Sequence, residues 1–403
     1  MSLPTIDDLS SGQTVLCRLD LNSPVEDGTV RDNRRFARHA ETVRDLLADD
    51  HAVVCLAHQG RPGDDDFVSL RQHAGILSEH VGQDVSFVPE VCGDVALEAV
   101  DDLESGDALL LENVRMHDDE LPERPAEEHA ESDLVGTLAA HADAYVNDAY
   151  SAAHRAHASL VGFPLVLPAY AGRVMVAEYE ANTAIANRTF DGQVTMVCGG
   201  TKAADVVSVM RALGDRVDRF CLGGIAGELF LRADGHDVGY DVADTDHFDD
   251  QWADVEDDVR AMLEDHHDAV SLPADLAYED EDGERAEVAV PDVDSKEQSY
   301  LDVGERTVET YADAIADSEA VFVKGALGVF EDERFARGTV GVLEAIAGTD
   351  CFSVVGGGDT SRAIDMYDLD EADFSHVSIA GGAYIRALTG EELPAVAALR
   401  RSA

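Results

Sequence analysis

Lysine is nearly absent from the sequence, although arginine is plentiful. Only Lys202, Lys296 and Lys324 occur, against 26 arginines. Acidic residues far outnumber basic ones. The sequence has 83 aspartates and glutamates and 29 lysines and arginines, which gives a formal net charge of −54. Binding to nucleic acid needs a basic footprint, which this composition lacks, so nucleic acid is excluded as a partner. Because lysine is so rare here, a lysine inside a glycine-rich motif is a stronger candidate for a functional residue than usual.

The acidic residues are spread along the chain and do not form a single tail. They are densest at 241–268 and 279–297. A protein with this charge repels itself in dilute buffer. In molar salt the Debye length falls to ~3 Å, which screens that repulsion. The composition therefore predicts a halophilic protein.

Long apolar runs and paired cysteines are missing as well. No run approaches the ~20 apolar residues that cross a membrane, and the first residues have neither a basic start nor an apolar core typical of a secretory signal. The six cysteines are widely spaced and form no CxxC pair. These absences predict a cytoplasmic protein that is kept in a reducing environment and does not contact a membrane.

Short apolar strand patterns alternate with helical patterns along the whole chain, which predicts an α/β protein with parallel, helix-covered sheets. In the first half, the expected strands are 14–19, 52–57, 86–89, 108–111 and 144–147. In the second half, they are 194–198, 219–222, 269–272, 320–323, 351–355 and 376–379. A long uninterrupted helical pattern at 172–187 separates the halves, and the acidic stretch 241–268 is expected to form a solvated helix and loop.

Five expected strands of the second half run into glycine. These junctions read "VTMVCGGTKAAD", "FCLGGIAGE", "VFVKGALGVFE", "FSVVGGGDTSRA" and "VSIAGGAYIRA". Glycine lets backbone amides approach a ligand, and a helix N-terminus adds a partial positive charge. The sequence has neither GxxxxGK[ST] nor a GxGxxG after its first strand, which argues against a P-loop enzyme and a dinucleotide dehydrogenase. The pattern favours a mononucleotide at the carboxyl edge of the sheet.

The strand ends of the first half carry cations instead. The junctions read "CRLDLNSP", "AHQGRPG", "LENVRMH" and "VNDAYSAAHRAHASL", together with "DNRRF" at the start of a helix. Arginine binds phosphate through two parallel hydrogen bonds and stays charged. Any one of these arginines could instead form a surface ion pair. Five clusters that each follow a strand favour a shared anion pocket, with Asp20 and Asn22 accepting from a ligand hydroxyl.

Seven motifs in this order resemble the phosphoglycerate kinase family: "RLDLNSP", "AHQGRPG", "LLENVRMH", "VNDAYSAAHRAH", "GGTKAAD", "KGALGVFEDERFARGT" and "VVGGGDT". The resemblance covers essentially the whole chain. It implies a monomer of two Rossmann-like domains joined by a long helix and hinge, which must close during the reaction. The implied reaction moves a phosphoryl group between 1,3-bisphosphoglycerate and ADP, giving 3-phosphoglycerate and ATP, with Mg²⁺ as cofactor.

The resemblance also implies domain bounds. Residues 1–172 would bind 3-phosphoglycerate, 173–190 would form the interdomain helix, and 191–387 would bind MgADP or MgATP. The C-terminal segment, about 388–403, would pack back on the first domain.

On the substrate side, the resemblance places Arg35 at the transferred phosphoryl group, with Arg34 a lesser candidate. The remaining substrate-binding residues would be Asp20, Asn22, His58, Arg61, Arg115 and Arg155. In the stretch that carries Arg155, the neighbouring His154 and His157 would support or pack against the pocket.

On the nucleotide side, Lys202 would neutralise the transferred phosphoryl group or the nucleotide phosphates. Asp359 would hold Mg²⁺ with Thr360 near the phosphates, and Glu331 would accept from the ribose hydroxyls. Helix-start amides would come from Gly357, Gly358, Gly381 and Gly382. The adenine slot would be walled by Gly199, Gly200, Gly223 and Gly224. The catalytic residues would thus be Arg35, Lys202, Gly358 and Gly381.

The sequence departs from the family pattern at several of these motifs. The family's second lysine after "GGAK" is replaced by Val206, and Lys324 stands where the family has asparagine. Lys324 either supplies the missing charge, as a nucleotide-binding residue, or only replaces a polar loop residue. The last glycine motif, at residues 378–382, has fewer glycines and no threonine. Ser151-Ala152 replaces Gly-Thr, which is expected to remove a flexible glycine and a hydroxyl just ahead of the pocket.

Two other functions fit an α/β protein of two domains. A dehydrogenase would need the dinucleotide fingerprint, which is absent. A non-catalytic nucleotide or anion-binding protein on the same scaffold would lack Arg35, Lys202 or Asp359, and all three are present.

Overall fold

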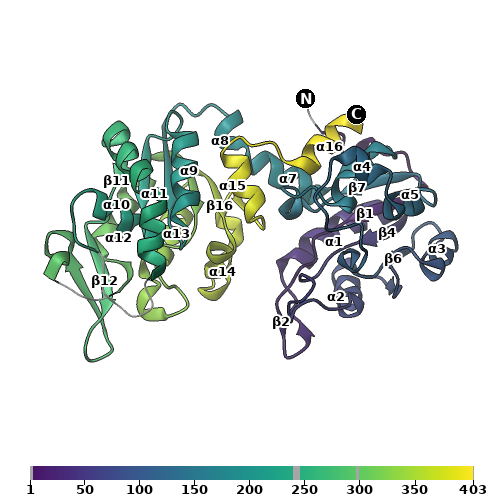
Figure 1. The fold of residues 1–403 in the computed structure, drawn as a ribbon, viewed down its shortest axis with the longest axis horizontal. Coiled ribbons are helices and arrows are strands. Elements are labelled where there is room, and N and C mark those ends of the chain that lie inside the picture. The colour runs from purple at the N-terminus through teal and green to yellow at the C-terminus, as the bar shows by residue number, and fades with distance from the viewer. Residues whose placement is uncertain (1–2, 239–245, 296–298, 403) are drawn as a thin grey trace. The chain divides into compact units, whose positions relative to one another are not determined.

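The computed structural model describes residues 3–238, 246–295 and 299–402 (Figure 1). The chain divides into two compact units, one formed by Met1–Glu180 with Glu392–Ala403 and the other by Ala181–Glu391. Each unit contains a parallel six-stranded sheet covered by helices. The expected α/β class is therefore confirmed.

The sheet of the first unit has the strand order β5-β6-β4-β1-β7-β8, with all neighbours parallel. Its strands are β1 (Thr14–Arg18), β4 (Ala52–Leu56), β5 (Val85–Phe87), β6 (Ala108–Leu110), β7 (Ala144–Asn147) and β8 (Ala169–Ala171). A short hairpin is formed by β2 (Val25–Glu26) and β3 (Thr29–Val30). Strand β4 is buried at every position, as a continuous apolar run covered on both faces requires.

Helices cover both faces of this sheet, as Figure 1 shows for α2 on one side and α4 and α5 on the other. The α-helices are α1 (Arg34–Ala48), α2 (Arg71–Val81), α3 (Asp94–Asp101), α4 (Ala126–Ala130), α5 (Asp133–Ala139), α6 (Ala158–Val161), α7 (Arg173–Asn182) and α16 (Pro394–Ser402). Short 3₁₀ helices lie at η1 (Ile6–Asp8), η2 (Val114–Met116), η3 (Tyr150–Ala152) and η4 (Phe163–Leu165). The C-terminal helix α16 joins the unit through a hydrogen bond from the Ala395 amide to the Ala153 carbonyl.

The sheet of the second unit has the order β11-β10-β9-β15-β16-β17 and is also parallel. Its strands are β9 (Gln193–Cys198), β10 (Arg219–Leu222), β11 (Val270–Ser271), β15 (Ser318–Lys324), β16 (Phe352–Gly356) and β17 (His376–Val377). The α-helices are α8 (Ala184–Asn187), α9 (Ala203–Leu213), α10 (Gly224–Ala233), α11 (Asp246–His266), α12 (Glu305–Ala316), α13 (Arg337–Ala347), α14 (Gly358–Met366) and α15 (Gly382–Leu388). Three 3₁₀ helices are η5 (Val290–Ser295), η6 (Glu333–Phe335) and η7 (Glu371–Asp373).

A small antiparallel sheet in the second unit was not expected from the sequence. It has the order β13-β12-β14, with β12 at Asp275–Glu279, β13 at Arg285–Ala289 and β14 at Tyr300–Val303 (Figure 1). Acidic and polar residues interrupt the apolar pattern of these strands, so the strands are not recognised from hydropathy.

The long helix expected at 172–187 is interrupted. Helix α7 ends at Asn182, and Thr183, with φ −96° and ψ 0°, caps the separate short helix α8. Asparagine and the β-branched threonine both have low helix propensity, which accounts for the break. The acidic stretch expected at 241–268 forms α11 from Asp246, while its first residues lie outside the described part of the chain. No helix among the described residues is long and apolar enough to span a membrane.

Candidate active site

Polar side chains of the first unit follow four adjacent strands of its sheet. Parallel strands point the same way, so the residues after β1, β4, β6 and β7 meet at one edge. These segments and the start of α1 carry the predicted substrate residues Asp20, Asn22, Arg35, His58, Arg61, Arg115 and Arg155. Helix α1 is capped by Asn33, whose side chain accepts a hydrogen bond from the Arg35 amide at 2.9 Å. The cap places Arg35 in the first turn.

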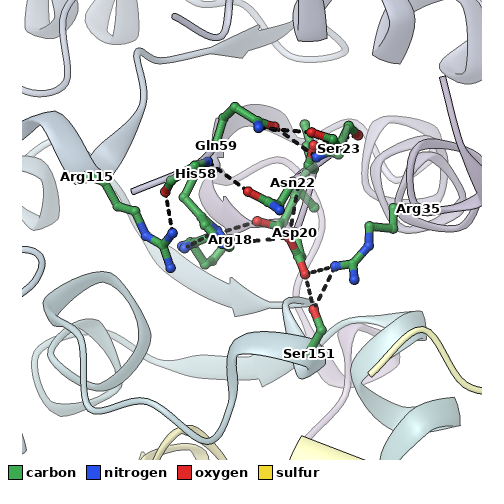
Figure 2. Close-up of polar contacts among 12 residues, drawn as sticks. Arg18, Asp20, Asn22, Ser23, Arg35, His58, Gln59, Arg115 and Ser151 are labelled. Atoms are coloured by element: carbon green, nitrogen blue, oxygen red, sulfur yellow. Dashed lines mark hydrogen bonds and ion pairs between the residues drawn. The ribbon is translucent and has the colours of Figure 1, made fainter. Parts of the chain in front are cut away.

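Asp20 is the centre of this site (Figure 2). Its Oδ2 accepts hydrogen bonds from Arg35 and from the Ser151 hydroxyl. Its backbone amide donates to His39 Nε2 at 3.3 Å, so the other ring nitrogen carries the proton and donates to Asp148 at 2.7 Å. Burial is the largest single influence and would raise the pKa of Asp20, but the Arg35 guanidinium, the neighbouring histidines and the Ser151 hydrogen bond together outweigh it and hold that pKa below its usual range. Asp20 is therefore a fixed carboxylate.

His58 lies beside Asp20 and is kept neutral. Burial, reinforced by the charge of Arg18, lowers the pKa of His58 well below its usual value. Arg18 Nη2 donates to His58 Nδ1 at 3.1 Å, so the proton of the neutral ring sits on Nε2, which is 3.9 Å from Asp20 Oδ1. Arg18 is itself buried, and its Nε donates to Ser159 Oγ at 2.7 Å. His58 thus presents an N–H donor to the pocket.

Arg18 holds His58 in place, a role that the sequence did not predict. The sequence signal was only its position at the end of β1.

Several cations of this edge lie close enough to repel one another. Burial, then the charges of Arg18 and Arg155, lower the pKa of Arg115 to about 10. Burial and the charge of Arg61 also lower the pKa of Arg155. Arg115 donates to the Gly60 carbonyl, and its buried Nε has no hydrogen-bond partner among the described residues (Figure 2). Asn22 accepts from the Gly60 amide at 2.8 Å. Converging cations with spare donors form a site for a multiply charged anion.

The loop after β7 brings a second residue that the sequence analysis missed. Ser151 lies in η3, and its hydroxyl binds Asp20 and lies 3.3 Å from Arg35 Nη1 (Figure 2). The exchange of Gly-Thr for Ser-Ala therefore keeps a hydroxyl at this edge, one residue earlier in the chain. His157 is buried, 3.8 Å from Glu120, and its pKa is lowered to about 3 by burial and then by Arg115. It is a neutral neighbour of the cations.

In the second unit the strand ends pack backbone against backbone. The Gly199 amide donates to the Lys324 carbonyl at 2.8 Å, and Gly223 donates to the Cys198 carbonyl at 2.9 Å. Gly325 has φ +84°, and a Cβ there would overlap the Gly199 carbonyl. Only glycine allows the neighbouring strands to close in this way.

Two adjacent cavities open over these strand ends and share Gly200, Thr201 and Asp359. The larger, about 480 Å³, is mainly apolar and is lined by Gly224, Leu276, Tyr300, Glu331 and their neighbours. The smaller has a volume of about 190 Å³. Its lining includes Gly199, Lys202, Asp205, Lys324, Gly325, Gly357, Gly381 and Tyr384. A flat apolar ligand and an adjoining anionic group would fit these two cavities in turn.

The lysines of the smaller cavity come from different elements. Lys202 caps α9 and is exposed, whereas Lys324 ends β15 and is 8% exposed. Val206, on the first turns of α9, is fully buried in the core. Lys324, and not residue 206, is therefore the second cation at this cavity.

Some of the predicted nucleotide residues do not line either cavity. Thr360 is buried, and its hydroxyl donates to the Gly356 carbonyl at 2.9 Å. Gly223 packs against Leu327. Gly358 and Gly382 are also not among the lining residues, although they begin α14 and α15 beside the smaller cavity. Glu331 lines the larger cavity and forms an ion pair with Arg362 at 3.2 Å.

Asp359 provides an exposed carboxylate at the point where the cavities meet. Among the described residues, no group of three or more His, Cys, Asp or Glu side chains could hold a metal by itself. A single carboxylate suits Mg²⁺, which is commonly held by one or two carboxylates together with phosphate oxygens and water. The donor set therefore fits a magnesium ion that arrives with a nucleotide.

Comparison with known proteins gives one consistent family. A family model described as phosphoglycerate kinase matches residues 6–391. The sequence is 69% identical over 399 residues to phosphoglycerate kinase from Halorubrum lacusprofundi, covering 99% of this chain and 98% of that one. It is 65% identical over 401 residues to the enzyme from Haloarcula marismortui, covering 100% of both. The structure resembles the crystal structure of phosphoglycerate kinase from Pyrococcus horikoshii OT3, with a TM-score of 0.91, 32% identity and 99% of each chain covered.

Proposed function

The chain belongs to the phosphoglycerate kinase family, and we propose that it moves a phosphoryl group reversibly between 1,3-bisphosphoglycerate and ADP. In the direction of ATP synthesis, a β-phosphate oxygen of ADP attacks the phosphorus of the acyl phosphate. The new P–O bond forms as the bond to the carboxyl oxygen breaks, and 3-phosphoglycerate leaves as a carboxylate with the bonding electrons. The relatives support this catalytic function and not the alternative of a non-catalytic binding protein.

The single observation that carries the proposal is the convergence of cations around Asp20. Arg61, Arg115 and Arg155 are proposed to bind the triose phosphate, with the Nε2–H of His58 as an additional donor. Asp20 and Asn22 are proposed to orient the hydroxyl and carboxyl end. Arg35, held by Asp20, is proposed to contact the transferred phosphoryl group.

For the nucleotide, the larger cavity is proposed to hold the base and ribose, with Glu331 accepting from the ribose. The smaller cavity is proposed to hold the phosphates against Lys202, Lys324 and the amides near Gly357 and Gly381. Gly200 and Gly224 are proposed to line the adenine slot of the larger cavity, and Gly199 and Gly223 let the strand ends pack closely beside it. Asp359 would hold Mg²⁺, which neutralises phosphate charge when bound.

The chemistry needs positioned charge more than a proton carrier. The attacking phosphate and the departing carboxylate are both ionised, so no general base is required. The site agrees with this requirement, because the buried His58 and His157 have lowered pKa values and remain neutral. Arg35 and Lys202 supply positive charge that does not depend on a proton shuttle.

We further propose that the protein works as a cytoplasmic monomer adapted to high salt. The charge of −54 supports salt adaptation, as do the two relatives from halophilic archaea. The same charge argues against nucleic acid as a partner.

A coupled assay tests this function. Acyl phosphate formation from 3-phosphoglycerate and MgATP is followed in molar KCl, with folding checked by circular dichroism in the same buffer. We expect saturable turnover that requires both substrates and is lost when glycerate, which lacks the phosphate read by the cations, replaces 3-phosphoglycerate. Folded protein without turnover would overturn the proposal.

A further inference from the structure

Lys324 is a buried cation at the centre of the second sheet's carboxyl edge. It is the last residue of β15, where it pairs in register with Cys198 of β9 and Gly356 of β16. The chain continues from those two neighbours directly into the glycine turns of the smaller cavity. Lys324 lines this cavity, and its side chain is only 10% exposed. Its ammonium is thus placed between the two turns that carry the phosphate-binding amides.

The positive charge of the Lys324 ammonium is only weakly balanced by its neighbours. Its Nζ lies 3.8 Å from Asp205 Oδ2, which is close enough for attraction but too long for a hydrogen bond. Within the described ranges, no hydrogen bond to this ammonium is found. A buried charge without hydrogen bonds is unfavourable, so this arrangement lowers the stability of the fold unless a ligand completes it.

The composition of the chain and the neighbouring helix α9 also support a ligand-binding role for Lys324. Only three lysines remain in 403 residues, and two of them, Lys202 and Lys324, line this one cavity. Val206 is fully buried, so position 206 of α9 adds no cation to the one supplied by Lys202. Lys324 is therefore the second cation of this cavity, in addition to Lys202.

We propose that Lys324 is a catalytic residue whose ammonium leaves Asp205 and binds the oxygens of the phosphoryl group during its transfer to ADP. This inference rests on the proposed function. In that step the β-phosphate oxygen forms the new bond to phosphorus, the carboxylate departs with its electron pair, and Lys324 keeps all its protons. Asp205 holds the ammonium in the cavity between turnovers. Lys324 and Lys202 then flank the transferred group from two different elements.

The charged and titratable groups around Lys324 set how its contribution varies with pH. Burial is the largest influence and lowers the pKa of Lys324, and the charge of Lys202 adds to this effect, whereas the carboxylates of Asp205 on α9 and Asp359 on α14 oppose it. Cys198, the paired residue on β9, is buried, and burial raises the pKa of its thiol to about 12. From α15, Tyr384 lines the cavity, and its buried hydroxyl donates to the Val323 carbonyl. Asp205 is thus the carboxylate nearest to the ammonium.

The first test removes the charge and keeps the length of the side chain. We expect Lys324→Met to lower kcat about 100-fold or more, the size expected for losing one preorganised group at the transferred charge. KM for 3-phosphoglycerate is expected to stay within about threefold, because that ligand is bound by the other unit. Resistance to unfolding should not fall, since replacing a buried charge by an apolar group is neutral or stabilising. Arg211→Met, at an exposed residue of the same helix α9 as Asp205, is the control and should keep full activity.

A second pair of measurements separates catalysis from a structural role. Lys324→Ala should regain part of its lost kcat when methylammonium or ethylammonium is added, because the free amine can enter the vacated cavity. Asp205→Asn should shift the alkaline fall of kcat to lower pH, because the carboxylate that favours the ammonium is gone. A purely structural lysine would show neither effect.

The outcomes distinguish this inference from the function on which it rests. If the wild-type protein turns over and Lys324→Met keeps its kcat, the inference is wrong and the kinase function stands. If kcat falls but neither amine rescue nor the pH shift is seen, Lys324 is structural and the inference is again wrong. If the folded wild-type protein has no turnover in molar KCl, the proposed function is wrong and the inference with it.

Discussion

At the scale of single residues, the substrate pocket depends on Asp20. This carboxylate accepts hydrogen bonds from both Arg35 and Ser151. The backbone amide of Asp20 donates a hydrogen bond to His39. Because Asp20 stays ionised over the ordinary pH range, it holds Arg35 in one orientation at the rim of the pocket. A preorganised cation requires no rearrangement when charge moves during the reaction.

Removing the Arg35 guanidinium should therefore impair the chemistry more than the fold. We expect Arg35→Ala to lose about 100-fold or more in turnover in the coupled assay, while its thermal unfolding in molar KCl stays cooperative. Lys202→Ala should behave in the same way. Arg31→Ala removes an exposed arginine paired with Glu26 and should retain normal turnover. Near-normal turnover of the Arg35 variant would contradict the assigned role.

The buried His73 should make the free energy of unfolding decrease at acidic pH. Burial lowers the pKa of His73 to about 4, whereas an unfolded histidine titrates near 6.5. Between these values the unfolded chain binds a proton that the folded protein does not. The contribution of His73 is therefore complete above pH ~6.5 and is lost as the pH falls toward ~4, by on the order of 3 kcal/mol.

We expect His73→Gln to flatten this part of the stability profile, measured by chemical unfolding in molar KCl at a series of pH values. His267→Gln replaces an exposed imidazole and controls for the substitution itself. An unchanged slope for the His73 variant would show that another group causes the acid sensitivity.

The cations of the pocket could be predicted from sequence, but their partners could not. Arg35, Arg115 and Arg155 follow expected strands or begin a helix, so topology alone placed them together. Arg18 and Ser151 act through side-chain contacts between distant segments, to His58 and to Asp20, and no local pattern reveals such contacts.

At the scale of elements, the glycine turns of the second sheet serve two different purposes. A Cβ on Gly199 would overlap the carbonyl of Ala326, whereas a Cβ on Gly358 would meet no protein atom within 4 Å. The first glycine is needed for packing between strand ends. The second, at the start of α14, is needed only if a ligand approaches its backbone.

Alanine substitutions should separate these roles. Gly199→Ala is expected to destabilise the fold by about 1–3 kcal/mol, as overpacking does, measured by chemical unfolding. Gly358→Ala should leave stability within about 1 kcal/mol, because alanine is well tolerated in a helix. The Gly358 variant should still lose turnover, because its methyl group would crowd the nucleotide phosphates. Full turnover in Gly358→Ala would remove this residue from the catalytic set.

The sequence predicted the parallel sheets well because their strands are continuous apolar runs. Strands β1, β4, β7 and β10 lie within a residue or two of the expected ranges. The small sheet of β12, β13 and β14 was missed because acidic residues break its apolar pattern. The interruption at Thr183 was missed because the surrounding alanines favour a helix on both sides.

At the scale of the whole molecule, the charge of −54 determines the conditions under which the protein folds. Repulsion among the acidic residues opposes the compact state, and salt screens that repulsion. We expect the midpoint of thermal unfolding to fall steadily as KCl is diluted from molar concentration, with cooperative folding lost in salt-free buffer at neutral pH. A cooperative transition that persists without salt would contradict the adaptation.

The proposed reaction moves a phosphoryl group between the nucleotide and the carboxyl group of 3-phosphoglycerate. Hydroxylamine traps acyl phosphates as hydroxamates and leaves phosphate esters intact, so it reports directly on which oxygen receives the phosphoryl group. With 3-phosphoglycerate, MgATP and hydroxylamine in molar KCl, we expect hydroxamate and ADP in equal amounts, formed only when the folded protein is present. ADP without hydroxamate, or neither product from folded protein, would contradict the proposed reaction.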